Sequence, residues 1–315
     1  MSLRVLVTGA TGFVGHALCV ELMRCGHTTR GASRSSVSGA RLAVDVEPVL
    51  VAAVDGATDW SVASRDVDVV VHLAARVHVM RDKLAEPLAE FRRTNVEGTL
   101  SLARQAAAAG VRRFVFISSI GVNGAETDLA PFAADDAAAP HSPYAQSKYE
   151  AELGLRALAA QTGLEVVIIR PPLVYGPNAP GNFGSLTRWL MRGVPLPLGA
   201  ITQNRRSLVA LDNLVDLIVT CITHPAAANQ TFLVSDGEDL STTDLLRRMG
   251  QALGKPARLL PVPPALLKLG AALLGKPELA QRLCGSLQVD ISKTRELLGW
   301  VPPLSVDEGL RRAAK

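Results

Sequence analysis

Short apolar runs alternate with longer stretches of helical periodicity through the first half of this chain. Each helical stretch, at 14–26, 91–110 and 142–163, ends at a glycine, as helices commonly do. Runs that are apolar on both faces are typical of the central strands of a parallel sheet. Strands that alternate with helices predict a doubly wound, Rossmann-type α/β fold. The apolar runs are RVLVTG (4–9), TTRGAS (28–33), VDVVVHLAA (67–75), RFVFISS (113–119) and LEVVIIR (164–170).

This alternation stops after Arg170, where loops rich in proline and glycine begin and helical patterns predominate. We therefore expect a dinucleotide-binding Rossmann domain at 1–170 and a smaller, mostly helical substrate-binding lobe at 171–204 and 235–315. The segment 205–234 contains RRSLVALDNLVDLIVTCI and TFLV, and we expect it to return to the sheet of the first domain.

Composition excludes several classes of protein. The 315 residues are 48% hydrophobic and 20% charged, which is typical of a folded globular chain. The net charge of +4 comes from scattered arginine pairs without a long basic run, so nucleic-acid binding is not expected. Four cysteines without C-x-x-C spacing predict neither disulfides nor zinc, and no metal site is expected. Met1 leads directly into an apolar strand without a signal-peptide pattern, so a cytoplasmic location is expected.

The most apolar stretch is LLPVPPALLKLGAALLG, residues 259–275. Its three prolines and Lys268 leave a continuous apolar segment that is too short to cross a bilayer. We therefore expect no membrane insertion, and we interpret the stretch as a buried or an interfacial helix.

A glycine-rich turn joins the first predicted strand to the first predicted helix. VLVTGATGFVG places Gly9, Gly12 and Gly15 in a G-x-x-G-x-x-G pattern. Glycine lets such a turn tighten and lets the backbone approach a pyrophosphate, whose charge then meets the helix N-terminus. The turn therefore predicts a dinucleotide site.

The end of the second strand bears on which dinucleotide binds. A carboxylate there would bind the ribose 2′-hydroxyl of NAD, whereas the sequence offers Ser33 and Arg34. An arginine can pair with a 2′-phosphate, so NADP is slightly favoured over NAD. Asp55, in VAAVDGATDW (51–60), has two interpretations: it accepts a hydrogen bond from the adenine amino group, or it only shapes a turn.

Tyr144 and Lys148 lie four residues apart, which places them on one face of a helix. Ser142 and Pro143 suit the N-cap and first position of that helix. A phenol is a poor base at neutral pH, but a cationic lysine beside it favours its ionised form. A hydroxyl from a neighbouring strand end would complete a proton-transfer site, and FVFISSIG supplies Ser118 or Ser119.

Five motifs occur in order: TGATGFVG, HLAA, T-N-V-x-G-T at 94–99, the strand end FISS, and Y-x-x-x-K. Together they resemble the extended short-chain dehydrogenase/reductase family, and within it the nucleotide-sugar epimerases and reductases, over nearly the whole chain. The resemblance implies a catalytic set of Ser119, Tyr144 and Lys148. It also implies that the cofactor contacts Gly9, Thr11, Gly12, Phe13, Val14, Gly15, Ser33, Arg34, Asp55, Ala74, Ala75, Asn95 and Lys148.

For the second lobe, the resemblance implies a UDP-linked sugar as substrate. Asn182 and Arg205 match the positions that contact a diphosphate, with Arg206 or Arg282 as further candidates, and Leu198 belongs to the apolar stretch that flanks uracil. Arginine suits a diphosphate through its fork of donors. Ser119 and Tyr144 would contact the sugar itself.

The reaction type has several candidates. A sugar 4,6-dehydratase would carry an acidic pair after the hydroxyl residue, whereas Ile120 and Gly121 follow Ser119, so dehydration is disfavoured. A 4-ketoreductase acting on a UDP-4-keto-6-deoxy-N-acetylhexosamine is slightly favoured, because the residues favour NADPH. A UDP-hexose or UDP-N-acetylhexosamine 4-epimerase is the alternative. A non-catalytic NADPH-binding regulator is a further alternative, and a homodimer is expected from the resemblance.

Overall fold

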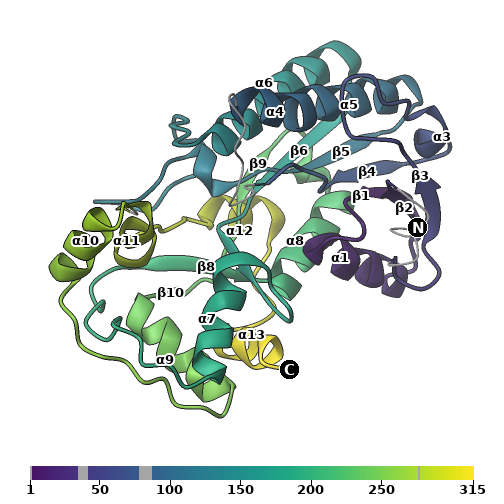
Figure 1. Ribbon diagram of the computed structural model, residues 1–315. Coiled ribbons are helices and arrows are strands. Elements are labelled where there is room, and N and C mark those ends of the chain that lie inside the picture. The colour runs from purple at the N-terminus through teal and green to yellow at the C-terminus, as the bar shows by residue number, and fades with distance from the viewer. Residues whose placement is uncertain (1, 35–41, 78–86, 276) are drawn as a thin grey trace.

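The computed structural model describes residues 2–34, 42–77, 87–275 and 277–315. Its main feature is a seven-stranded sheet in which all paired strands run parallel, in the order β3-β2-β1-β4-β5-β6-β9 (Figure 1). This order confirms the doubly wound α/β prediction. The strands are β1 (Arg4–Thr8), β2 (Thr28–Ser33), β3 (Glu47–Leu50), β4 (Val69–His72), β5 (Arg113–Ile117), β6 (Glu165–Arg170) and β9 (Thr231–Leu233).

Helices cover both faces of this sheet. On one face pack α1 (Phe13–Arg24), α8 (Leu211–Thr223) and α12 (Ser292–Leu298). On the other face pack α3 (Ser61–Ser64), α5 (Thr99–Ala108) and α6 (Pro143–Thr162). A short helix, α4 (Pro87–Arg92), and a π-helical turn, η1 (Arg93–Gly98), lead into α5. The result is three layers, with two hydrophobic cores separated by the sheet.

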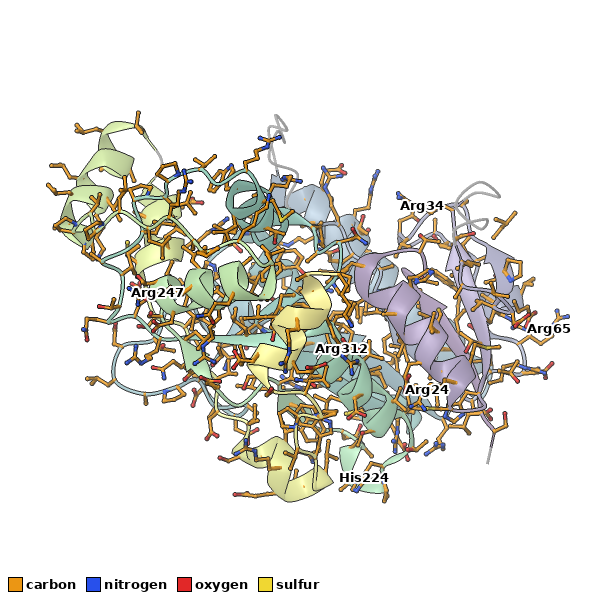
Figure 2. All side chains as sticks on the ribbon, turned by 90° about the horizontal axis from the view of Figure 1, so that it is seen from below. Arg24, Arg34, Arg65, His224, Arg247 and Arg312 are labelled. Atoms are coloured by element: carbon orange, nitrogen blue, oxygen red, sulfur yellow. The ribbon has the colours of Figure 1, made fainter. Side chains whose placement is uncertain are left out.

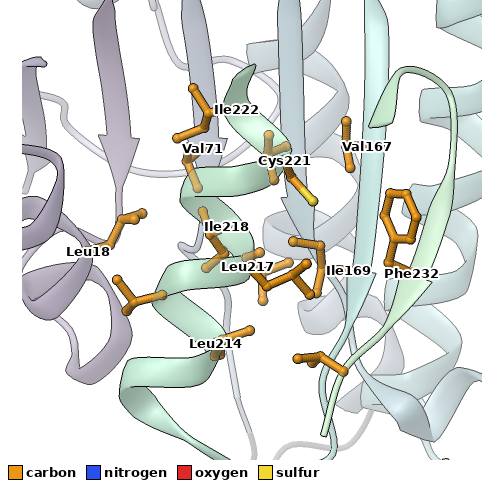
Figure 3. Close-up of a cluster of buried hydrophobic side chains, with 14 of the residues drawn as sticks. Leu18, Val71, Val167, Ile169, Leu214, Leu217, Ile218, Cys221, Ile222 and Phe232 are labelled. Carbon is orange, nitrogen blue, oxygen red and sulfur yellow. The ribbon is translucent and has the colours of Figure 1, made fainter. Parts of the chain in front are cut away.

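Alternation along each strand distributes its side chains between these cores. Val5 and Val7 of β1 point toward α1 and α8, whereas Leu6 points to the opposite core. Figure 3 shows the first core, where Leu214, Leu217 and Ile218 of α8 face the strands. Burying one such side chain contributes about 1.5–3 kcal/mol, so apolar packing on both faces holds the sheet together.

The second lobe is built around a small sheet of three strands in the order β10-β8-β7. We expected 205–234 to return to the large sheet; β9 lies there, but β8 pairs with β7 and β10 instead. The proposed division into 1–170 with 205–234, and 171–204 with 235–315, stays a prediction. The elements of this part are β7 (Leu173–Tyr175), α7 (Gly181–Met191), β8 (Arg206–Ala210), β10 (Asp239–Leu240), α9 (Thr242–Ala252), α10 (Pro264–Leu273), α11 (Pro277–Cys284) and α13 (Val306–Ala313).

The apolar stretch 259–275 forms α10, and none of the residues of this helix is buried. The expectation of a buried helix is therefore wrong, which leaves the interfacial interpretation. Within the described ranges, no helix is both long enough and apolar enough to cross a membrane.

Candidate active site

The turn between β1 and α1 has a geometry that requires glycine at two positions, Gly9 and Gly15. Gly9 has a φ of +69°, and a Cβ placed on it would lie 2.9 Å from the backbone nitrogen of Ala74. A Cβ on Gly15 would lie 2.1 Å from the carbonyl oxygen of Gly9. Gly12 caps α1 without any side-chain hydrogen bond, so the first amides of the helix are not covered by a capping side chain. The turn thus forms a backbone cradle for an anion at a helix N-terminus.

A cleft of about 600 Å³ opens beside this turn, between the carboxyl ends of β1 and β4. Strand order reverses at this point of a doubly wound sheet, and ligands bind there in such folds. The volume lies within the range of small-molecule and cofactor sites, so the cradle and the cleft together fit a dinucleotide. Eight of the predicted cofactor residues line the cleft: Gly9, Thr11, Gly12, Ser33, Arg34, Asp55, Ala74 and Ala75.

Other predicted cofactor residues lie behind the cleft surface. Phe13 and Val14 start α1, and their side chains pack against the hydrophobic cores. Gly15 follows in the first turn and is buried. At these three positions a ligand would therefore meet the backbone rather than a side chain.

The end of β2 contributes Ser33, which is buried, and Arg34, which is exposed. Figure 2 shows Arg34 at the margin of the molecule beside the first strands. Among the described residues that line the cleft, Asp55 carries the one carboxylate. Its Oδ1 accepts hydrogen bonds from the amide of Ala57 (3.1 Å) and the hydroxyl of Thr58 (3.0 Å), so the turn-forming role is present.

Tyr144 and Lys148 occupy the first two turns of α6. The helix begins as predicted, with the hydroxyl of Ser142 accepting from the amide of Ala145 (3.2 Å) and Pro143 at the first position. Lys148 is 2% exposed, and its Nζ donates to the carbonyl oxygen of Ile117 (2.8 Å).

Burial shifts the pKa values of both side chains. It lowers the pKa of Lys148 to about 7, against the opposing effect of the Glu152 carboxylate. It raises the pKa of Tyr144 to about 12. The ring of Tyr144 also meets Phe91 edge-on, with 6.1 Å between centroids. Burial thus favours the neutral form of each group, and a nearby opposite charge would favour ionisation of the tyrosine.

The two serines at the end of β5 have different surroundings. Ser118 donates to Oε1 of Glu152 (2.5 Å) and is buried, so it is held away from the cleft. Ser119 accepts from the amide of Gly121 (3.1 Å), and its own proton is used in no hydrogen bond among the described residues. A Cβ on Gly121 would lie 3.4 Å from Ser119 Oγ and 3.3 Å from Ala145 Cβ, so this hydroxyl lies beside the first turn of α6.

A buried ion pair beneath these residues was not predicted. Glu152 is fully buried and Arg170 is 2% exposed. The guanidinium binds the carboxylate through two bonds, Nε to Oε1 (2.9 Å) and Nη2 to Oε2 (2.6 Å), and also donates to Asn123. The spacing of Glu152, four residues after Lys148, was a signal that it shares the buried face of α6.

His72, in the HLAA motif, is also fully buried at the end of β4. Thr99 donates to the carbonyl oxygen of Asn95 (2.7 Å), so His72 Nε2 donates to Thr99 Oγ1 (3.0 Å). Nδ1 then accepts from Thr8 Oγ1 (2.7 Å), which in turn accepts from the amide of Ala74 (3.2 Å). Burial, with a smaller effect from Lys148, lowers the pKa of His72 to about 3, so the ring is neutral.

Asn95, expected to contact the cofactor, sits in the π-helical turn η1 and is 1% exposed. Its Oδ1 accepts from the amide of Arg76 (2.8 Å), and its Nδ2 donates to the carbonyl oxygen of Arg76 (3.0 Å) and to Ser147 Oγ (3.0 Å). Ser147 donates to the carbonyl oxygen of Tyr144 (2.7 Å). Asn95 therefore joins the loop after β4 to the helix that carries Tyr144. π-helical turns occur frequently at functional sites.

The second-lobe candidates lie in different environments. Asn182 is exposed at the start of α7, whereas Leu198 is 4% exposed and packs in the lobe's core. Arg205 is exposed and donates to the carbonyl oxygens of Thr202 and Asn204.

Arg206, a further candidate from the sequence, is better placed than Arg205 to bind a diphosphate. Arg206 is partly buried, and its pKa is lowered first by burial and then by the nearby charge of Arg282. Its Nη1 donates to the carbonyl oxygen of Gly285 (3.0 Å). Arg282 has Glu278 within ion-pair distance (3.6 Å), whereas Arg206 has no carboxylate partner among the described residues, so an anion would stabilise the charge of Arg206.

No cluster of histidine, cysteine, aspartate or glutamate suited to a metal ion occurs in the part of the chain that the structure describes. The predicted site therefore consists of a dinucleotide cleft, the set of Ser119, Tyr144 and Lys148, which is not among the described residues that line this cleft, and two arginines, Arg206 on β8 and Arg282 on α11.

Comparison with known proteins links these features. A sequence model described as the NAD dependent epimerase/dehydratase family matches residues 5–235. UDP-glucose 4-epimerase from Vibrio cholerae is 50% identical over 313 residues, covering 99% of this chain and 94% of that protein.

Two solved structures share the fold. UDP-N-acetylglucosamine 4-epimerase from Bacillus cereus superposes with a TM-score of 0.80 at 22% identity, covering 99% of this chain and 98% of that one. UDP-glucuronic acid 4-epimerase from Bacillus cereus, in complex with NAD, gives a TM-score of 0.78 at 22% identity, covering 99% and 97%. At this level of identity the likeness concerns the fold.

Proposed function

We propose that this chain, which belongs to the NAD dependent epimerase/dehydratase family, is a UDP-hexose 4-epimerase. The sequence motifs indicated the same group of proteins, as the nucleotide-sugar branch of the extended short-chain dehydrogenase/reductase family. The observation that carries the proposal is the 50% identity with the Vibrio cholerae UDP-glucose 4-epimerase over nearly the full length of both chains. UDP-glucose and UDP-galactose are the proposed pair of substrates, with their N-acetyl counterparts as the first alternatives to test.

This proposal replaces the preference for a 4-ketoreductase. That preference depended on the missing carboxylate at Ser33, which bears on the cofactor rather than on the reaction. Ser119, Tyr144 and Lys148 suit both reactions, because each requires a proton to move as C4 changes between alcohol and ketone. The relatives described above are epimerases by name, and this supports the epimerase over the reductase.

The chain's own residues would handle the proton at C4. Tyr144 would accept the proton of the C4 hydroxyl and later return it, and Ser119 would hydrogen-bond the same oxygen. Burial disfavours the charged form of each group. Lys148, when protonated, would favour the ionised phenol, because an opposite charge nearby stabilises it. A bound nicotinamide dinucleotide supplies the hydride acceptor and donor for C4.

We propose NAD as the cofactor, contrary to the preference for NADP drawn from Arg34. The exposed position of Arg34 at the cleft margin gives it no fixed partner geometry, and the Bacillus cereus neighbour was solved with NAD. Denaturing the purified protein and weighing the released nucleotide tests this assignment. Recovery of NADP in place of NAD would overturn it.

For the substrate diphosphate, we propose Arg206 and Arg282, with Asn182 at the start of α7 as a further candidate. Arg206 is a better candidate than Arg205, because Arg205 is exposed and donates to two carbonyl oxygens, whereas Arg206 donates to one and has the charge of Arg282 nearby. The uracil contact assigned to Leu198 stays a prediction, and the burial of that side chain restricts it to the backbone.

The decisive experiment incubates the pure protein with UDP-glucose or UDP-galactose and follows the 4-epimer by chromatography. The proposal requires interconversion without net change in nicotinamide oxidation state. Consumption of one NAD(P)H per product from a 4-keto UDP-sugar, without epimerisation, would favour the reductase. No turnover, with activity in the cell unaffected by Tyr144→Phe, would favour the non-catalytic regulator.

We also propose a homodimer through the outer faces of α5 and α6. On these two helices Ala103 and Leu155 are buried in the core, whereas Leu153 is 46% exposed and available for such a contact. Light scattering coupled to gel filtration gives the mass directly, and a monomer would refute this part of the proposal.

A further inference from the structure

The helix α10 combines an apolar sequence with an exposed position. A helix that is apolar on all sides is normally buried, yet no residue of Pro264–Leu273 is buried here. Leu266, Leu269 and Leu273, spaced three and four residues apart on one face, are 58%, 57% and 80% exposed. Figure 1 shows α10 and α11 projecting from the second lobe, away from the large sheet.

The opposite side of α10 already has a partner. Leu267 packs against the core of the second lobe together with Leu283 and Cys284 of α11. The three outward leucines therefore form a second apolar face that the fold does not use. We call Leu266, Leu269 and Leu273 the outer face of α10. Exposed apolar groups gathered in this way mark an interaction surface.

The charges that adjoin the outer face in the sequence are basic. Between Asp244 and Glu278 there is no acidic residue. Arg247 and Arg248 of α9 are ion-paired with carboxylates, so the remaining basic residues of that interval are Lys255, Arg258, Lys268 and Lys276. Glu278 itself lies within ion-pair distance of Arg282. An apolar helix face flanked by lysine and arginine is typical of helices that lie in the plane of an anionic membrane surface.

A second copy of the chain fits this face less well. A ten-residue helix is about 15 Å long, whereas a stable protein interface buries about 800 Å² on each partner. One such helix supplies only a small part of that area. A bilayer needs no matching surface, because three leucines enter the acyl boundary one by one while lysines remain among the headgroups.

From these observations we propose that the outer face of α10 docks the protein on an anionic lipid surface, with its leucines in the interface. This attachment is independent of the proposed epimerase activity. It would hold the second lobe at the membrane, because Leu267 on the other side of α10 packs against the core of that lobe.

Flotation of the full-length protein with lipid vesicles tests the proposal. We expect it to float with vesicles of phosphatidylcholine and phosphatidylglycerol at low salt, and to float much less with phosphatidylcholine alone. Replacing all three leucines by serine should weaken binding about 1,000-fold or more, since each buried leucine accounts for about tenfold or more. Lys268→Gln, which removes one charge, should weaken it about fivefold, and by less at high salt.

A matched control changes exposed apolar residues elsewhere, in Val20→Ser, Val62→Ser and Val301→Ser, which are 50%, 62% and 65% exposed in the native chain. This variant should float like the unchanged protein. Failure of the unchanged protein to bind anionic vesicles overturns the proposal, as does equal binding by the leucine variant. A fall in solution mass of the leucine variant, at unchanged vesicle binding, would instead assign the face to contacts between copies. None of these measurements depends on catalysis.

Discussion

Adding one methyl group at Gly15 should disable the cofactor cradle. The Cβ of Gly15→Ala would lie 2.1 Å from the carbonyl oxygen of Gly9, and real Cβ contacts stay beyond 3.0 Å. The start of α1 must therefore move from the turn by about 0.9 Å, the difference between these two distances. Overpacking of this kind costs about 1–3 kcal/mol of stability.

The same displacement moves the helix amides that would meet a pyrophosphate. Loss of one charge-assisted hydrogen bond costs about 1.5–3 kcal/mol, so we expect NAD affinity to fall about 10- to 100-fold. Calorimetric titration of nucleotide-free protein with NAD measures the affinity, and urea unfolding measures the stability.

Two other glycines give a graded control series. A Cβ on Gly12 would lie 3.1 Å from the same oxygen, so Gly12→Ala should have a smaller effect. Gly270, inside α10, has no atom within 4 Å of the added Cβ, and Gly270→Ala should leave NAD binding unchanged while raising stability slightly. Unchanged affinity and stability in Gly15→Ala would refute the reasoning, as would a larger effect at Gly12.

Three further predictions concern Tyr144, Glu152 and His72. Tyr144→Phe should lower the epimerisation rate about 10²- to 10⁴-fold with NAD still bound, whereas Tyr149→Phe on the same helix should be nearly silent in the same assay. Glu152→Gln should destabilise the fold by about 3–5 kcal/mol in urea, because it leaves the Arg170 charge buried without its partner. The more exposed pair of Glu150 with Arg92 is worth about 1 kcal/mol at most, so a similar loss in Glu150→Gln would contradict the argument. The pKa of His72 in the folded chain is about 3, below its ordinary value of 6.5, so as the pH falls the unfolded chain binds this proton first. The free energy of unfolding should therefore fall by about 1.4 kcal/mol per pH unit between about pH 6.5 and pH 3. ¹⁵N NMR of the folded protein at pH 5 should find the neutral Nε2–H form of His72, and an imidazolium there would refute this.

Strands β1, β4, β5 and β6 of the large sheet could be predicted from the sequence because they are largely apolar on both faces, whereas β3 (Glu47–Leu50), a largely exposed edge strand, was not among the predicted runs. β2 occupies the predicted residues, and α6 begins at the predicted cap. β8 was placed in the wrong sheet, since RSLVA is as apolar as a central strand and nothing local encodes which neighbour it pairs with. Strand pairing depends on contacts between distant segments, which periodicity does not report.

In the candidate site too, features set by local sequence could be predicted, whereas features set by contacts between distant segments could not. Spacing alone predicted that Tyr144 and Lys148 share a helix face, and the glycine pattern predicted the cradle. The choice between Ser118 and Ser119 could not be made from the strand itself, because the deciding partner, Glu152, is 34 residues away. The roles of His72 and Arg206 likewise depend on groups that the fold brings together from other elements.

The two hydrogen bonds between the Asn95 side chain and the backbone of Arg76 have a consequence for local opening of the structure. The amide of Arg76 can exchange with solvent deuterium only when the Asn95 side chain releases it, and Asn95 is held in turn by Ser147 of α6. The wall of the cleft and the helix that carries Tyr144 should therefore open together rather than one after the other. In a hydrogen-exchange experiment the Arg76 amide would report the rate at which the cleft wall and the start of α6 open together.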